Sequence, residues 1–235
     1  MFSYYGSKSK IVKFYPEPQY DTIIEPFAGS ARYSLKYWDR NVLLMDTSPY
    51  VSVVWKYLIA ASEKDILRLP IVESKVSLDT IKSLSVAERY LIGFYLCRGK
   101  AKPRTVGHGQ NSWVPATRRA IANDLYKIRH WNFVNLSYET LSYTGRATYF
   151  VDPPYKSVQE RAGNSDRYPE WQVNYPHLAD WCSERDGQVI VCETSGATWL
   201  PFRELVEVNA NTNGKSVKKN KEMIWTNDIL SEYSW

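Results

Sequence analysis

The sequence predicts an α/β fold in which a mixed, seven-stranded sheet is interrupted by an inserted region. Over residues 21–61, two short apolar runs alternate with helical patterns, as in the βα units of nucleotide-binding folds. Further apolar runs at 147–151 and 188–192 resume this alternation after a long interruption. The C-terminal part, 205–226, has the pattern of a hairpin, and an antiparallel hairpin beside parallel strands gives a mixed sheet.

Length and composition limit the class of protein. A chain of 235 residues suits one sizeable α/β domain with an insertion and is short for two independent domains. No apolar stretch is long enough to span a bilayer, and the start lacks the apolar core of a signal peptide. The three cysteines, Cys97, Cys182 and Cys192, are widely spaced and form neither a zinc pattern nor a disulfide framework. We therefore expect no metal and a reducing, cytosolic setting.

The first strand, around Ile23 and Ile24, ends in a turn with a single glycine. Strand, turn and helix form the first unit of a nucleotide-binding fold, and helical spacing follows here over 33–38. The three-glycine fingerprint that brings the backbone close to a pyrophosphate is absent. S-adenosylmethionine has no pyrophosphate and would not need it. The turn reads Glu25-Pro26-Phe27-Ala28-Gly29-Ser30-Ala31.

The second strand, expected over 42–45, is followed by an acid. Asp46 stands 17 positions beyond Gly29, where Rossmann-like domains place an acid that hydrogen-bonds ribose hydroxyls. A helix then begins at Thr47-Ser48-Pro49 and places apolar residues on one face. Asp46 could instead cap that helix, but its position directly after the strand favours the ribose ligand.

Residues 62–130 break the alternation of strand and helix. We expect them to form an insertion between two parts of one catalytic domain, 1–61 and 131–235. Ser85 and Glu88 have the spacing of a capping box before an aromatic-rich helix over 90–97. A loop is expected over 99–115, and helical spacing returns over 117–129.

The insertion concentrates positive charge. Between Cys97 and His130 lie eight of the thirty basic residues of the chain and one of its twenty-five acids. A basic segment on a near-neutral body is typical of nucleic-acid binding and makes the insertion a candidate target-recognition region. An ordinary solvated face is the alternative. The candidate DNA-binding residues are Arg98, Lys100, Lys102, Arg104, Arg118 and Arg119, with Lys215 and Lys218 from the lysine-rich tip of the C-terminal hairpin.

The rest of the chain returns to alternation. Strands are expected at 133–136, 147–151 and 188–192, with a helix over 176–185. The polar segment 155–171 is too long for a simple connection, and loops of this length are usually functional or mobile.

The apolar run 147–151 ends in Asp152-Pro153-Pro154-Tyr155. Each proline lacks an N–H and fixes its φ near about −65°, and a residue before proline is pushed to extended geometry. A stiff loop is therefore expected at the carboxyl end of a strand, where open α/β sheets bind ligands. It offers a carboxylate, carbonyls and an aromatic face, which suit a flat base with an exocyclic amine. The same dipeptides also occur in ordinary turns.

These motifs occur in an order that resembles the Dam-like (D12 class, α-group) DNA adenine-N6 methyltransferases. The resemblance spans essentially the whole chain and depends on Tyr4-Tyr5-Gly6-Ser7-Lys8, Glu25-Pro26-Phe27-Ala28-Gly29, Asp46 and Asp152-Pro153-Pro154-Tyr155. The resemblance implies a Rossmann-like methyltransferase fold. It also implies an enzyme that acts on double-stranded DNA in the cytoplasm of a bacterial or phage-infected host cell. The implied S-adenosylmethionine site comprises Tyr4, Gly6, Lys8, Glu25, Phe27, Gly29, Asp46, Tyr138 and Asp152.

The chain departs from this family in two places. Ser30 stands where the first turn commonly has a glycine, which bears on the fine geometry of the cofactor site. The insertion lacks the segment expected of a GATC-specific member, so that specificity is not implied.

The residues agree with chemistry at an exocyclic amine, whose lone pair is delocalised into the ring. We expect one N–H to donate to Asp152 and the other to the Pro153 carbonyl, turning the nitrogen towards tetrahedral geometry. The base must leave the stack, and Tyr155 and Tyr138 are the candidate stacking faces, with Pro154 completing the catalytic set. The same chemistry would serve cytosine N4. A non-catalytic DNA-binding protein with a degenerate cofactor site is the alternative from another class.

Overall fold

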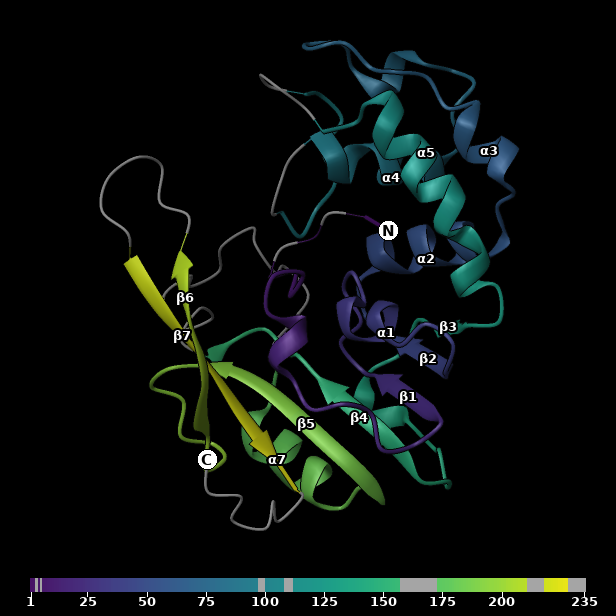
Figure 1. Cartoon of the computed structure of the whole chain (residues 1–235). Helices are drawn as coiled ribbons and strands as arrows, with labels where there is room; N and C mark the ends of the chain where they lie inside the picture. The colour runs from purple at the N-terminus through teal and green to yellow at the C-terminus, as the bar shows by residue number, and fades with distance from the viewer. Residues whose placement is uncertain are drawn as a thin grey trace.

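The structure is a computed structural model that describes residues 1–2, 4, 6–96, 100–107, 112–156, 173–210 and 218–227. Its centre is a seven-stranded sheet with the strand order β3-β2-β1-β4-β5-β7-β6 (Figure 1). This confirms the predicted mixed sheet of seven strands. The strands are β1 (Thr22–Glu25), β2 (Asn41–Met45), β3 (Asn132–Val134), β4 (Ala147–Val151), β5 (Gly187–Thr194), β6 (Arg203–Ala210) and β7 (Lys218–Thr226).

Five neighbouring strands, from β3 to β5, are parallel, whereas β7 runs antiparallel to both β5 and β6. From β1 the chain proceeds to β2 on one side, and from β4 it proceeds to β5 on the other. The order therefore reverses between β1 and β4, which pair directly. Open α/β sheets bind ligands at such a switch point, outside the carboxyl ends of the strands.

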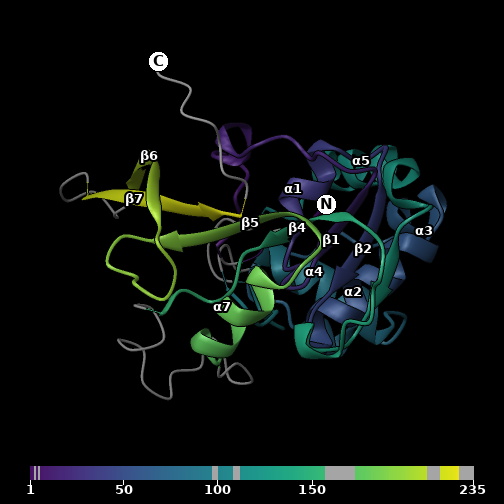
Figure 2. The same cartoon turned by 90° about the horizontal axis from the view of Figure 1, so that it is seen from below.

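Helices cover both faces of the sheet, and the β6–β7 hairpin projects from its far end, away from α2 and α3 (Figure 2). Successive strand residues point to opposite faces, so Ile23 packs in the apolar layer that contains Trp55 and Ile24 in the layer that contains Trp181. The helical segments are η1 (Val12–Phe14), α1 (Arg32–Lys36), α2 (Pro49–Ala60), α3 (Glu63–Leu67), η2 (Leu78–Thr80), α4 (Val86–Leu96), α5 (Pro115–Asp124), η3 (Leu125–Ile128), η4 (Tyr138–Thr140) and α7 (Tyr175–Ser183).

Element boundaries differ from the expected ones where a side chain or a partner strand decides them. Helix α4 begins at Val86 rather than residue 90, because the capping box is formed: the Ser85 N–H donates to Glu88 Oε2 (2.7 Å) and the Glu88 N–H to Ser85 Oγ (3.3 Å). Strand β3 ends at Val134, and the next side chain, Asn135, donates to the Asp46 carbonyl (2.6 Å). Strand β5 extends to Thr194 because β7 pairs with it that far.

The bounds of two expected helices also change, and two expected segments lie largely outside the described residues. The helix expected over 117–129 begins at Pro115 and, after Asp124, continues as the 3₁₀ segment η3. The expected helix over 176–185 runs instead from Tyr175 to Ser183. Most of the long loop 155–171 and the hairpin tip 211–217 lie outside the described residues.

The inserted region packs on the sheet domain through α2. In the described part of residues 62–130, short helices alternate with turns and irregular segments, and one isolated β-bridge joins Ser77 to Val106. Leu91 of α4 and Ile121 of α5 belong to the same apolar cluster as Trp55 of α2. The insertion and the sheet therefore share one continuous core.

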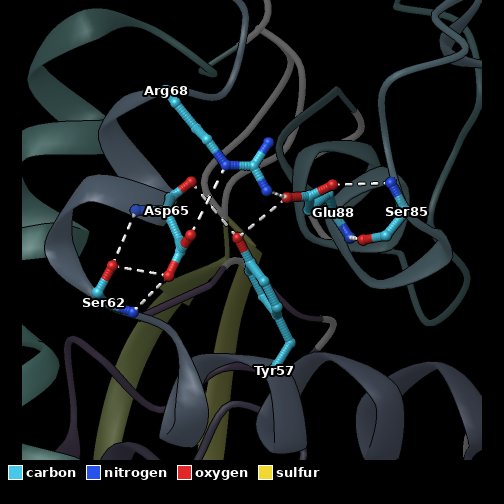
Figure 3. A network of polar contacts seen from close by, with 6 residues as sticks. All are labelled: Tyr57, Ser62, Asp65, Arg68, Ser85 and Glu88. Carbon is cyan, nitrogen blue, oxygen red and sulfur yellow. Dashed lines mark hydrogen bonds and ion pairs between the residues drawn. The ribbon is translucent and has the colours of Figure 1, made fainter.

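A polar network also links α2, α3 and α4 (Figure 3). Glu88, 2% exposed, accepts hydrogen bonds from the hydroxyl of Tyr57 (3.4 Å) and from the guanidinium of Arg68. A buried carboxylate that loses such partners is strongly destabilising, so this network fixes how α3 and α4 sit on α2.

Within the described ranges, no helix has the length and apolar character needed to cross a membrane. The same residues contain no group of three or more His, Cys, Asp or Glu side chains that could hold a metal ion.

Candidate functional site

The switch point brings together the loops that carry most of the predicted site residues. The turn from Glu25 to Gly29 follows β1, Asp46 follows β2, and Asp152 follows β4. Because these strands are parallel neighbours, the three loops leave the same edge of the sheet.

The turn at Gly29 is fixed from three directions. Its N–H donates to Asp46 Oδ2 (2.9 Å), and its carbonyl accepts from the indole of Trp55 (2.8 Å). Its φ of +45° lies in the left-handed region, and a Cβ added there would lie 3.0 Å from the ring of Tyr4. A side chain at this position would thus be strained by the backbone and crowded by Tyr4.

Asp46 is 3% exposed, and its carboxylate holds two backbone donors. In addition to the Gly29 N–H, the carboxylate accepts the N–H of Ser48 (2.8 Å). The residue that caps α2 is Ser48, whose hydroxyl accepts the N–H of Val51, so the helix-cap alternative for Asp46 is not what the structure shows. Asp46 ties the turn after β1 to the end of β2. Its role as a ribose ligand stays a prediction.

Glu25, also predicted to line the cofactor site, is buried and accepts the Ser34 N–H at the first turn of α1 (2.7 Å). The N-cap residue of α1, Ala31, has no side chain that could do so. Burial raises the pKa of Glu25 to about 8. The described contacts of Glu25 therefore orient the helix that follows the turn.

Phe27 and Tyr138 form an aromatic pair beside this turn. Their ring centroids lie 5.5 Å apart, and Tyr138 also packs edge-on against Trp181 of α7 at 5.5 Å. The Tyr138 hydroxyl lies 2.9 Å from Nδ1 of His177, and burial raises the pKa of that hydroxyl to about 12. Among the described aromatic pairs, none joins Tyr138 to Tyr155, so the two expected stacking faces are not brought together here.

Lys8 and Asp152, 144 positions apart, form a partly buried ion pair. The Lys8 ammonium lies 2.7 Å from Asp152 Oδ1 and 3.3 Å from the carbonyl of Gly6, whose φ is +73°. Burial alone would lower the pKa of Lys8, but the charges of Asp152 and Glu222 raise it above its usual value. The ammonium therefore stays charged. Gly6 and Lys8 thus join Asp152 at the end of β4.

Asp152 keeps some contact with solvent, since its side chain is 21% exposed against 7% for Lys8. Burial raises the pKa of Asp152 to about 6, although Lys8 lowers it, and the charge of Glu222 adds to the increase. At neutral pH the side chain is therefore mostly ionised, but it binds a proton more readily than an ordinary aspartate does.

The two prolines and Tyr155 are held rigidly. Pro153 and Pro154 are buried, and the Tyr175 hydroxyl of α7 donates to the Pro154 carbonyl (2.6 Å). No donor among the described residues contacts the Pro153 carbonyl. The ring of Tyr155 lies under the Lys8 ammonium, 4.7 Å from its centroid, and the Tyr155 hydroxyl donates to Glu222 Oε1 (2.6 Å).

Sequence reasoning did not identify Glu222 and Tyr15 as site residues. Glu222 Oε1 also accepts the Tyr15 hydroxyl (2.6 Å), and Lys8 Nζ lies 3.8 Å away. One signal was present in the sequence: Glu222 shares the face of its strand with Ile224, two positions on, and Ile224 is fully buried. An acid on the buried face of a strand marks a polar partner inside the fold.

The predicted DNA-binding residues separate into exposed and engaged side chains. Lys100, Arg104 and Arg119 are exposed, and Lys102 is half-buried. The Arg118 guanidinium donates to the carbonyls of Leu67 (3.1 Å) and Leu69 at the end of α3. Lys218 begins β7, while Arg98 and Lys215 lie outside the described residues.

Comparison with known proteins gives one partial family match and one distant structural match. The model of the D12 class N6 adenine-specific DNA methyltransferase family matches residues 4–83, which include the turn at Gly29 and Asp46. The crystal structure of a putative methylase from Haemophilus influenzae matches with a TM-score of 0.36 and 10% sequence identity, over 86% of this chain and 85% of that one. The comparison with curated proteins finds no match.

Proposed function

We propose that this chain transfers a methyl group from S-adenosylmethionine to the N6 amine of an adenine flipped out of double-stranded DNA. The observation that carries the proposal is the arrangement at the end of β4. A partly exposed carboxylate, Asp152, sits on a proline-fixed loop with a carbonyl and an aromatic ring next to it. The family match over residues 4–83 supports the reaction class, because it covers the motifs that meet Asp152 at the switch point.

The chemistry of the side chains fits a nucleoside cofactor that carries a cationic sulfur. Phe27 and Tyr138 offer aromatic rings for its adenine, and the buried acid Asp46 stands where a ribose would be bound. Asp152 and Glu222 supply negative charge beside the reacting centre. When bound, S-adenosylmethionine supplies a methyl group on a sulfonium.

In this proposal the protein acts mainly by positioning and electrostatics. Lys8 occupies Oδ1 of Asp152, so Oδ2 would accept one N–H of the target amine. The Pro153 carbonyl would accept the other N–H. The amine lone pair would form the new N–C bond as the bond between the methyl group and the sulfonium sulfur breaks, which leaves the sulfur as a neutral thioether. Asp152 would oppose the positive charge that develops on nitrogen. The proton that the amine loses passes through the hydrogen bond to Asp152 and on to solvent.

The rigidity of the loop matters because the amine must be turned out of conjugation with its ring. Lys8 holds the Asp152 carboxylate, and Tyr175 holds the Pro154 carbonyl and so restrains the loop that carries the Pro153 carbonyl. Both acceptors are therefore restrained before the base arrives. The base would stack on Tyr155 after leaving the duplex. Unstacking one base from the duplex costs a few kcal/mol.

The test is a product analysis with the matched variant Asp152→Asn. Purified protein is incubated with double-stranded DNA and methyl-labelled S-adenosylmethionine, and the DNA is hydrolysed and its bases are separated by mass spectrometry. We expect N6-methyladenine from the wild type, with a rate about 10²–10³ lower for the variant. N4-methylcytosine would assign the alternative amine. No methylated base, together with tight DNA binding, would favour a non-catalytic DNA-binding protein.

A further inference from the structure

Glu222 is a buried acid that holds two tyrosines with one oxygen. It lies in β7 and is 7% exposed, and its Oε1 accepts the hydroxyls of Tyr15 and Tyr155 at 2.6 Å each. The ammonium of Lys8 lies 3.8 Å from the same oxygen. Hydrogen bonds to an ionised acceptor are shorter and stronger than neutral ones, which agrees with both distances.

The two tyrosines differ in what holds them. Tyr15 is 3% exposed, and its ring meets Phe150 edge-on at 5.0 Å. Phe150 in turn stacks on Tyr33 at 4.3 Å with the ring planes 6° apart. Tyr15 is thus anchored in the core of the sheet and fixes the position of the Glu222 carboxylate.

Tyr155, by contrast, is half-buried, and its backbone follows two prolines that set its direction but not its side-chain torsions. The ring packs against the apolar core and, among the described residues, makes two polar contacts: the hydroxyl donates to Glu222, and one face lies under Lys8. Without the first polar contact, no hydrogen bond would select χ1 and χ2 of the ring. The orientation of this ring therefore depends on a residue 67 positions away, in a strand that joins the sheet between β5 and β6.

We infer that Glu222 is a positioning residue, which holds the Tyr155 ring in the orientation that receives the flipped base and which is itself fixed by Tyr15. This inference rests on the proposed function, because it gives the Tyr155 ring a base to receive. It gives the C-terminal hairpin a part in the reaction.

The charge of Glu222 has a second, separable effect. Lys8 lies between two carboxylates, 2.7 Å from Asp152 and 3.8 Å from Glu222. The negative charge of Glu222 raises the pKa of Asp152, and a neutral residue at 222 would let it fall. The other ionisable groups that interact with Asp152 come from β1 (Glu25), β5 (Cys192 and Glu193) and the loops that carry Tyr15 and Tyr155.

Four variants separate these effects. Glu222→Ala removes the acceptor and the charge, whereas Glu222→Gln keeps an acceptor oxygen and removes the charge. Tyr155→Phe keeps the ring and removes its hydroxyl. Glu204→Gln is the matched control, since Glu204 is an exposed carboxylate of the same hairpin, paired with Lys221 (2.7 Å).

The experiment uses two duplexes. Single-turnover methylation is measured as a function of pH on a duplex with adenine at the target position. A second duplex has 2-aminopurine in place of that adenine; it lacks the N6 amine and is not methylated, and its fluorescence reports the stacking of the flipped base. We expect Glu222→Ala and Tyr155→Phe to slow methylation about tenfold each, and the double variant to be no slower than either. In both, the flipped 2-aminopurine should be less quenched than in the wild type. Glu222→Gln should recover part of the rate and move the acidic limb of the pH profile to lower pH. Glu204→Gln should match the wild type.

The inference is overturned if the wild type methylates adenine while Glu222→Ala or Tyr155→Phe leaves rate and fluorescence unchanged. Additive losses in the double variant would overturn it as well, because two independent effects do not act through one contact. A wild type that yields no methylated base refutes the proposed function, and the positioning role with it.

Discussion

Lowering the pH should switch off methylation by protonating Asp152. Burial raises the pKa of this carboxyl to about 6, against the lowering effect of Lys8. About nine tenths of the carboxyl is then ionised at pH 7 and about one tenth at pH 5. Because the proposed mechanism needs the ionised form, activity is present above this pKa and is lost as the pH falls through it. The rate at pH 5 should be about tenfold lower than at pH 7.

The assay is single-turnover methylation with saturating S-adenosylmethionine and DNA, so that product release does not mask the chemical step. Asp152→Asn provides the control, because its residual rate should lack this inflection. Circular dichroism at each pH separates unfolding from titration.

A matched variant tests the assignment of the titrating group. Lys8→Gln removes the cation 2.7 Å from Asp152 and should move the inflection to higher pH. A wild-type rate that is flat from pH 7 to pH 5, or an Asp152→Asn variant with the same inflection, would show that another group titrates and would refute the reasoning.

Three further predictions concern the frame of the site and the DNA surface. Arg118→Ala should lower the melting temperature, because Arg118 holds the Leu67 carbonyl of α3. Arg119 is exposed, so Arg119→Ala should leave the melting temperature unchanged and reduce the slope of log DNA affinity against log salt by about 0.9. The reverse pattern would assign Arg118 to DNA. Asp46→Ala should weaken S-adenosylmethionine binding by about 1.5–3 kcal/mol in calorimetry and also lower stability, because it releases the Gly29 N–H; unchanged affinity in a folded variant would leave Asp46 a structural role alone. Because burial raises the pKa of Glu25 to about 8, its contribution to folding stability should be lost as the pH rises from about 4.5 to about 8, by at most about 1.4 kcal/mol per pH unit. The free energy of unfolding of Glu25→Gln, measured in urea, should therefore depend less on pH than that of the wild type. An equal dependence would contradict the raised pKa.

The sequence was sufficient for the elements whose signals are local. The apolar runs at β1, β2, β4 and β5 are recognisable because a strand buried on both faces must be almost continuously apolar. The capping box at Ser85 and Glu88 is also a local signal, since its partners are three residues apart. The same holds for Asp152, because two prolines restrict the backbone wherever the chain places them.

The predictions for Glu25 and Arg118 show where local signals stop. A glutamate suits a cofactor ligand or a solvated surface equally well, and an arginine suits a phosphate contact or a solvated surface equally well. In the structure Glu25 accepts the N–H of Ser34 and Arg118 donates to the carbonyl of Leu67, partners 9 and 51 positions away. Which backbone groups need a side-chain partner depends on how the helices end and pack, and the sequence does not state it.

The assembly around Asp152 depends on tertiary structure most of all. The sequence alone supplies Lys8, Tyr155 and Glu222, and its pattern places Glu222 in a strand. Only the folded sheet places the N-terminal segment, the end of β4 and an antiparallel strand from the C-terminal hairpin around one carboxylate. The physical reason is that contacts between residues 67 to 207 positions apart depend on strand order, and strand order follows from packing the whole chain rather than from any local pattern.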